Sequence, residues 1–258
     1  MTTYLDRILA EHRAAAADDP RQLDALIEQA QSCEPARGFR AGLAAVDGLG
    51  VISEIKRRSP SKGDLNTGVD PASWARSYER GGATALSVLT DANNFGGSVA
   101  DLQAARTAIS LPVLRKDFTV SANDVCDARI MGADAVLLIV AALDQHELAD
   151  FHALATDIGL DVLVETHDEA EVERAMAVGA TLVGVNQRDL VTFEVDTERA
   201  IRVGRSLPDD VIRVAESGVR GPDDCRSLKA AGYHAVLVGE SLVTSGDPAA
   251  AVADLRAV

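Results

Sequence analysis

The sequence predicts an α/β fold, specifically a single (β/α)8 (TIM) barrel with an N-terminal helical extension. Three observations predict it: eight short β-branched runs, helix-period segments between them, and an internal repeat. The chain has 258 residues, and single barrels of this kind typically have about 250. No linker rich in Pro, Gly or Ser divides the chain. We therefore expect one domain over residues 1–258.

The first part of the chain, residues 1–45, forms the predicted extension. Leu5, Ile8 and Leu9 recur at helical spacing, and so do Leu23 and Leu26 further along. No strand pattern appears in this part, so we expect two leading helices there.

The eight runs that follow have the length and composition of buried strands. They span residues 51–56, 85–90, 112–118, 135–140, 161–166, 182–188, 211–217 and 235–241. The segments between them have helical periodicity and recognisable starts. These starts include Asp70-Pro71 and two expected capping boxes, Asp144 with Glu147 and Asp168 with Glu171.

The internal repeat supports a barrel. A similar tetrapeptide stands at the start of every even-numbered run, and the four copies begin with Gly82, Gly132, Gly179 and Gly232. They recur at a period close to two βα units. Strands that are apolar on both faces belong in a parallel sheet covered by helices. An open doubly wound sheet is the competing fold. It is disfavoured because no Gly-x-Gly-x-x-Gly follows the first run and polar residues close most of the runs.

Composition limits the function classes. The chain is 47% hydrophobic and 25% charged, with a net charge of −15, which argues for a globular protein and against nucleic acid as a partner. Its longest apolar run, residues 135–143, is too short to cross a bilayer, and the N-terminus lacks a signal pattern. We therefore expect a cytoplasmic protein that does not bind membranes. A site for an anionic substrate must be built locally, against the acidic surface.

Cysteine and histidine give no sign of a metal centre. Cys33, Cys126 and Cys225 are odd in number and far apart, which favours neither disulfides nor zinc. His12, His167 and His234 are isolated in the sequence, and His146 and His152 share a probable helix at a spacing that points them apart, so all five are expected as surface or loop residues. No metal or cofactor is expected.

Polar residues at the ends of the runs predict an active site, because this fold assembles its site at the carboxyl ends of the strands. These residues are Glu54, Lys56, Lys116, Glu165, Asn186, Arg188, Glu216 and Ser217. Any one of them alone could be a solvated charge at a strand end. Where lysines and glutamates converge on one mouth, burial and neighbouring charges shift their pKa values apart. Such a cluster supplies a general acid and a general base.

A phosphate site is expected beside them. In this fold phosphate binds to the loops after the seventh and eighth strands and to the start of a short helix. The small residues Gly218, Gly239 and Ser241 occupy these positions, and Gly221-Pro222 starts the helix after the seventh run. For Gly239 the alternative is an ordinary tight turn.

A family resemblance sharpens this reading. Residues 51–63, VISEIKRRSPSKG, closely resemble the signature of indole-3-glycerol phosphate synthases, and the agreement covers nearly the whole chain from residue 51. It continues at residues 87–91, 114–118, 184–190, 192–196 and 215–218. The resemblance implies that 1-(2-carboxyphenylamino)-1-deoxyribulose 5-phosphate, a small sugar phosphate, is converted to indole-3-glycerol phosphate, carbon dioxide and water in tryptophan biosynthesis.

The resemblance also implies roles for individual residues. By position, Lys116 resembles the general acid at the sugar carbonyl and Glu165 the general base of the dehydration. Lys56 would pair with the anionic substrate or serve as a second acid. The residues that would orient these groups and complete the floor of the site are Glu54, Asn186, Glu216 and Ser217.

Other positions resemble substrate contacts. The pocket for the anthranilate ring would consist of Phe95, Phe118, Leu138 and Leu237, with plain barrel packing as the alternative. Ser59 and Arg188 would add contacts, and Gly218, Gly239 and Ser241 would form the phosphate cradle. Two departures from the family pattern stand out. Asn94 replaces a frequent aromatic residue, and Gln187, expected to point away from the mouth, replaces a common Asn.

Two other functions remain as alternatives. A sister barrel, phosphoribosylanthranilate isomerase, would need a Cys and an Asp at strand ends, and no Cys ends a run here. A non-catalytic phosphate-binding scaffold would not need Lys116 and Glu165. The sequence predicts no particular protein partner or oligomeric state.

Overall fold

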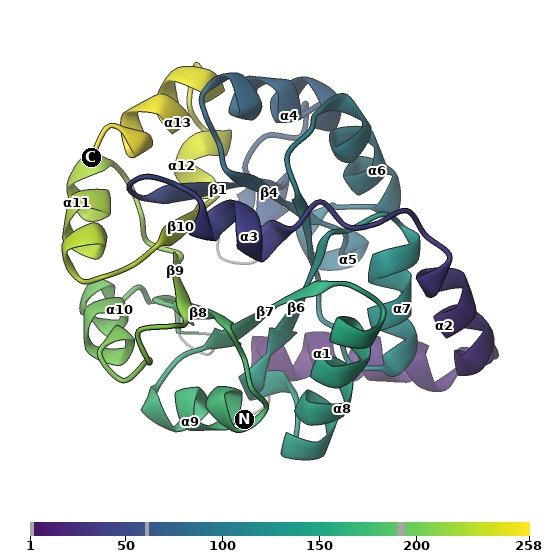
Figure 1. The fold of residues 1–258 in the computed structure, drawn as a ribbon. Coiled ribbons are helices and arrows are strands. Elements are labelled where there is room, and N and C mark those ends of the chain that lie inside the picture. The colour runs from purple at the N-terminus through teal and green to yellow at the C-terminus, as the bar shows by residue number, and fades with distance from the viewer. Residues whose placement is uncertain (1–2, 60–61, 190–193) are drawn as a thin grey trace.

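A computed structural model describes residues 3–59, 62–189 and 194–258. Within these residues, eight parallel strands form a closed barrel in the order β1-β10-β9-β8-β7-β6-β5-β4 (Figure 1). The strands are β1 (Gly50–Ile55), β4 (Ala85–Leu89), β5 (Val113–Lys116), β6 (Ala135–Ile139), β7 (Asp161–Thr166), β8 (Leu182–Asn186), β9 (Ile212–Glu216) and β10 (Ala235–Val238). Each overlaps one predicted run, so the predicted barrel is confirmed.

Helices surround the barrel as a ring (Figure 1). They are α4 (Pro71–Arg80), α6 (Val99–Ala108), α7 (Ala122–Ile130), α8 (Gln145–Asp157), α9 (Glu169–Ala177), α10 (Thr197–Gly204), α11 (Pro222–Ala230) and α13 (Pro248–Arg256). Short elements lie in the segments after the strands. These are β2 (Arg58–Ser59), β3 (Gly63–Asp64), α5 (Ala92–Phe95), the 3-10 turn η1 (Val140–Ala142) and α12 (Glu240–Val243).

All three predicted helix starts are confirmed, but only one of the two expected capping boxes is complete. The Asp70 carboxylate accepts the backbone N–H of Ser73, with Pro71 in the first turn. Asp144 and Glu147 form a complete capping box. At Asp168 the carboxylate accepts the backbone N–H of Glu171, so the helix starts as predicted. The return bond of the box is missing, because the carboxylate of Glu171 accepts the backbone N–H of His167 instead.

The N-terminal extension contains one helix more than predicted. It comprises α1 (Tyr4–Ala17), α2 (Leu23–Gln31) and α3 (Phe39–Ala44). Helix α3 is only six residues long, and it buries Phe39 and Leu43, which are one turn apart. Its Arg40 backbone N–H donates to Asp161 at the start of β7. Figure 1 shows α3 crossing the barrel at its N-terminal end.

The hydrophobic core is a single cluster that contains residues of all eight barrel strands and of the surrounding helices. Most strands are buried along their whole length, as expected of a parallel sheet covered on both faces. A helix both long and apolar enough for a membrane span is not found among the described residues.

Candidate active site

A cavity of about 860 Å³ opens at the carboxyl ends of the barrel strands. All eight barrel strands contribute residues to its lining, together with the loops that follow them. Every predicted site residue except Leu138 lines this cavity. The topology explains the gathering, because parallel strands in a barrel direct all their carboxyl ends to one mouth.

The prediction that Leu138 lines the ring pocket was wrong, and the alternative of plain barrel packing holds for this residue. It is fully buried in the core, and its neighbours Leu137 and Ile139 line the cavity instead. Successive side chains in a strand point to opposite faces, so Leu138 faces away from the cavity. Strand β6 is apolar on both faces, and its sequence therefore does not show which alternate residues point inward.

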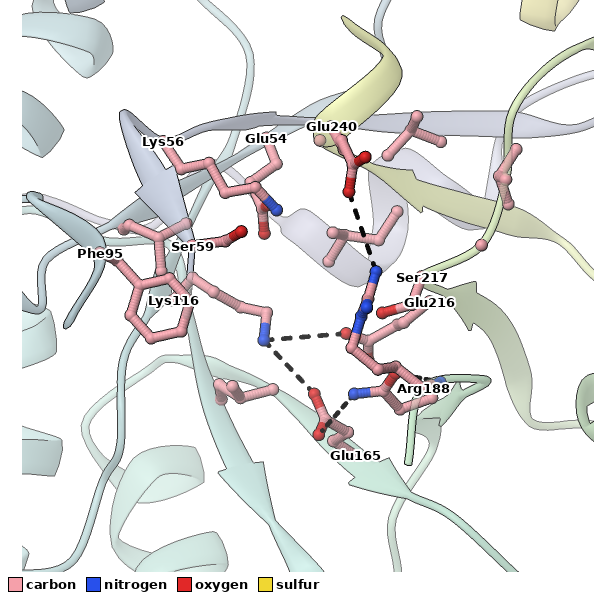
Figure 2. Close-up of a pocket in the computed structure, with 18 of the residues that line it drawn as sticks. Glu54, Lys56, Ser59, Phe95, Lys116, Glu165, Arg188, Glu216, Ser217 and Glu240 are labelled. Carbon is pink, nitrogen blue, oxygen red and sulfur yellow. Dashed lines mark hydrogen bonds and ion pairs between the residues drawn. The ribbon is translucent and has the colours of Figure 1, made fainter. Parts of the chain in front are cut away.

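Lys116 lies at the centre of the site. Its Nζ donates to Glu165 Oε2 at 3.3 Å and lies 3.9 Å from Glu216 Oε2. Figure 2 shows the ammonium pointing between the two carboxyl groups. Both carboxyl side chains are almost fully buried, 1% exposed for Glu165 and 2% for Glu216, whereas Lys116 is 18% exposed. Asn186 Nδ2 donates to the other oxygen of Glu165 at 3.1 Å.

The environment drives the pKa values of these groups apart. Burial alone would raise the pKa of Glu165, but the charges of Lys116 and His167 and the hydrogen bonds with Asn186 and Glu216 together lower it. Burial raises the pKa of Glu216 well above its ordinary value, and the charge of Glu165 raises it further. Burial opposes the charge on Lys116, yet the three glutamates around it raise its pKa overall. The mouth therefore holds three ionisable groups in close contact, whose pKa values their surroundings shift in different directions.

A second ion pair lies on β1. Lys56 Nζ is 2.5 Å from Glu54 Oε1, and both residues line the cavity. Two glycines leave room for the buried carboxyl groups. A Cβ at Gly239 would overlap the Glu54 carboxylate, and one at Gly184 would overlap that of Glu216. Gly184 was not predicted as a site residue, because its contribution is space.

One wall of the cavity is apolar. Phe95 and Phe118 lie with ring centroids 6.4 Å apart, and Leu237, Leu137 and Ile139 complete the lining. This wall is compatible with an aromatic ring.

The opposite side holds the predicted phosphate residues. Ser217 and Gly218 have φ values of 64° and 75°, and such a positive φ at a non-glycine residue is uncommon and typical of functional sites. The Ser241 hydroxyl donates to the Val219 carbonyl at 3.2 Å, in the first turn of α12. The expected short helix after the eighth strand is thus present.

Sequence reasoning missed two charged residues at this side. Glu240 lies 3.9 Å from Arg188 Nη2, an ion pair drawn in Figure 2, and 3.8 Å from Lys62 Nζ. Lys62 belongs to the signature segment, and Glu240 lies between two predicted phosphate residues. Position along the chain could have indicated both.

Two expected features of the sequence lie partly outside the described residues. Pro60 and Ser61 of the signature segment fall there, as do residues 190–193.

Gln187 does not line the cavity and instead donates to the Ser217 carbonyl at 2.7 Å, which agrees with its expected direction. Asn94 accepts a hydrogen bond from the Tyr4 hydroxyl at 2.9 Å, so α1 contacts the loop where the family often has an aromatic residue.

The expectation that the histidines are isolated was wrong for His12 and His167. His12, on α1, lies 3.2 Å from Asp91 and 3.8 Å from Asp117, and the ligand atoms of all three lie within 4.8 Å of one another. Such a set could hold a metal ion, so the expectation that no such cluster exists was also wrong. Both carboxylates already have protein partners, Asn94 for Asp91 and Arg115 for Asp117. No sequence pattern places α1 beside these loops.

His167 follows β7 directly and is only 12% exposed. Its Nε2 lies 3.6 Å from Glu165 Oε1, and its Nδ1 lies 3.0 Å from Glu171 Oε2. Its position two residues after a predicted catalytic glutamate was the available signal.

Comparisons with known proteins agree with this geometry. A family model described as "Indole-3-glycerol phosphate synthase" matches residues 5–255. Proteins of that name from a Nocardioides species and from Streptomyces griseus are 52% and 51% identical to the chain. The first match covers 97% of this chain and 90% of the relative, and the second covers 99% and 95%.

Solved structures show the fold at lower identity. A thiamine phosphate pyrophosphorylase from Pyrococcus furiosus has a TM-score of 0.61 at 18% identity, covering 81% of this chain and 94% of that one. An N-acetylmannosamine-6-phosphate 2-epimerase from Clostridium perfringens has a TM-score of 0.60 at 14% identity, covering 77% and 89%. The family match spans nearly the whole chain, and the curated relatives are half identical over almost their full length. The chain therefore belongs to the indole-3-glycerol phosphate synthase family of carboxy-lyases.

Proposed function

We propose that the barrel mouth converts 1-(2-carboxyphenylamino)-1-deoxyribulose 5-phosphate to indole-3-glycerol phosphate, carbon dioxide and water. The observation that carries this proposal is the Lys116 ammonium, which lies between the buried carboxyl groups of Glu165 and Glu216. Ring closure needs an acid and dehydration needs a base, and this cluster supplies both at neutral pH.

In the first step, the ring carbon that bears the carboxylate attacks the sugar carbonyl. Negative charge develops on the carbonyl oxygen, and Lys116 stabilises it and donates a proton. The bond between the ring carbon and the carboxylate then breaks, and carbon dioxide leaves. Lys56, paired with Glu54 at the edge of the same cavity, would contact the anionic substrate or serve as a second acid.

In the last step, the hydroxyl group leaves as water and a proton leaves the neighbouring carbon of the new ring. Glu165 is the base proposed for this proton, because Lys116 and Asn186 hold it as an oriented carboxylate. Glu216, whose pKa is raised by burial and by Glu165, contributes a protonated carboxyl group beside it. With Ser217 it completes the floor of the site.

The remaining lining supports the substrate's two ends. Phe95, Phe118 and Leu237 would pack on the anthranilate ring, with Ser59 and Arg188 as further contacts. The phosphate would bind among Gly218, Gly239 and Ser241.

The isomerase alternative has no support in the geometry. Cys126 lies on α7 and Cys225 on α11, both buried, and no cysteine lines the described part of the cavity.

The single hydrophobic core supports a one-domain chain. The three free cysteines support a reducing, cytoplasmic location.

The test is a turnover assay with the synthetic substrate, following indole absorbance in buffer with EDTA. We expect turnover that EDTA leaves unchanged, since no step requires a metal. Activity lost with EDTA and restored by a divalent ion would instead give the His12–Asp91–Asp117 cluster a role. An absence of turnover under all conditions would favour the scaffold alternative.

A Glu165→Gln variant tests the base assignment. We expect turnover to fall by roughly 100-fold or more, with little change in substrate affinity, because the amide keeps the size but cannot accept the proton. Glu173→Gln, an exposed change on α9, is the control. Near-normal turnover with a lowered melting temperature would mean that Glu165 is only an ion-pair partner of Lys116.

A further inference from the structure

His167 faces the catalytic carboxylate on the oxygen that Lys116 leaves free. Lys116 Nζ contacts Glu165 Oε2, whereas His167 Nε2 lies 3.6 Å from Glu165 Oε1, which also accepts from Asn186. The Nε2 atom is buried and has no hydrogen-bond partner among the described residues. Glu165 therefore has a second basic side chain beside it, the imidazole of His167, in addition to the ammonium of Lys116.

Helix α9 fixes the position of this ring. Glu171, in the first turn of α9, accepts the backbone N–H of His167 at 2.7 Å and lies 3.0 Å from its Nδ1 with the same oxygen. These two contacts replace only the return bond of the expected capping box, since the Asp168 carboxylate still accepts the backbone N–H of Glu171. They hold the imidazole between Glu171 and Glu165.

This arrangement selects the charged form of the ring. Each ring nitrogen faces a carboxylate oxygen, and a neutral imidazole would direct a lone pair at one of them. Only the imidazolium is a donor on both sides. Burial lowers the pKa of His167 and Arg199 on α10 lowers it further, but the hydrogen bond to Glu171 and the charge of Glu165 raise it overall.

We propose that His167 is a positioning residue, an imidazolium held by Glu171 that keeps Glu165 ionised and ready to accept a proton. The inference rests on the proposed function, because it acts through Glu165 as the general base.

The reaction itself gives this second cation a purpose. When Lys116 donates its proton during ring closure, it loses its positive charge. Glu165 then remains beside the buried Glu216 without that cation, although the dehydration still requires an ionised base. In the proposed reaction His167 donates no proton, so its charge persists through ring closure, decarboxylation and dehydration.

The main test is the pH dependence of kcat for the wild-type chain and His167→Asn. Asparagine removes the charge, so we expect the acid limb, which reports the coupled cluster, to move up by about one pH unit. The plateau kcat and KM should stay within about threefold of wild type. His152→Asn, which removes a half-buried histidine on α8, is the matched control and should leave the limb in place. A uniform loss of kcat with an unmoved limb would overturn the proposal.

NMR titration of the histidine rings gives an independent measurement on the wild-type chain. We expect His167 to titrate above its ordinary pKa of 6.5, and Glu171→Gln to lower that pKa by about one unit. Titration of wild-type His167 at or below 6.5 would overturn the proposal even if His167→Asn does not fold. A wild-type chain without turnover would refute the proposed function, while the titration would still decide the charge of His167.

Discussion

The barrel buries charge at both ends, but its two ends stabilise that charge in different ways. At the N-terminal end, Asp134 is fully buried and accepts from the backbone N–H groups of Arg37 and Val113 and from the Arg106 guanidinium. Arg129, also buried, donates to backbone carbonyls of residues 33, 34 and 158. These charges have fixed and complementary partners.

At the mouth, the buried charges are mismatched. Glu165 and Glu216 compete for one Lys116, and Glu216 Oε1 has no hydrogen-bond partner among the described residues. Backbone strain lies next to them at Ser217. The comparison shows that burial of charge alone does not mark a site. A cluster in which two buried carboxyl groups compete for one cation and shift each other's pKa values does mark one.

Lys116→Ala should produce the largest effect and separate the two ends. We expect kcat to fall by about 10²- to 10⁴-fold with little change in substrate affinity, because the acid acts mainly in the transition state. The two carboxyl groups can then share a proton, so the melting temperature should change modestly. Stopped-flow binding and steady-state kinetics measure the two quantities. Weak binding with normal turnover would assign the acid role to another residue, Lys56 first.

Asp134→Ala should show the reverse pattern. The change leaves two buried backbone N–H groups and Arg106 without their acceptor, and we expect the free energy of unfolding to fall by about 2–5 kcal/mol. The kcat of the folded fraction should not change. Asp150→Ala, at an exposed position on α8, is the control and should stay within about 0.5 kcal/mol of wild type. A specific loss of kcat in Asp134→Ala would erase the contrast between the two ends.

The same contrast explains how much the sequence could predict. Glu54, Lys116, Glu165, Asn186 and Glu216 were identifiable because a polar residue at the end of an apolar run has one destination in this fold. The register within a run was not identifiable where both faces are apolar. For that reason Leu138 was chosen where Leu137 and Ile139 line the cavity.

Contacts between distant segments were beyond the sequence. His12 meets Asp91 and Asp117 only because α1 packs over the mouth, and nothing in residues 1–45 specifies that packing. Helix α3 was missed because six residues give too little periodicity to recognise. The chemistry of the strand ends was therefore predictable, whereas the contacts that surround and tune it were not.

The smallest predicted effect concerns the attachment of α1 to the mouth. The hydrogen bond from His12 to Asp91 raises the pKa of His12, outweighing burial, and the charge of Asp117 adds to it. Because the folded-state pKa lies above 6.5, this stabilisation is fully present below pH 6.5 and is lost as the pH rises through the raised value. His12→Gln should therefore lower the free energy of unfolding by about 1 kcal/mol at pH 6 and by less at pH 9. His152 provides the opposite sign, since burial lowers its pKa. Its protonation below pH 6.5 opposes folding, so His152→Gln should be relatively more favourable at pH 6 than at pH 9. Denaturant unfolding of both variants at the two pH values measures this, and equal losses for His12→Gln at both would show that its contact with Asp91 does not depend on charge.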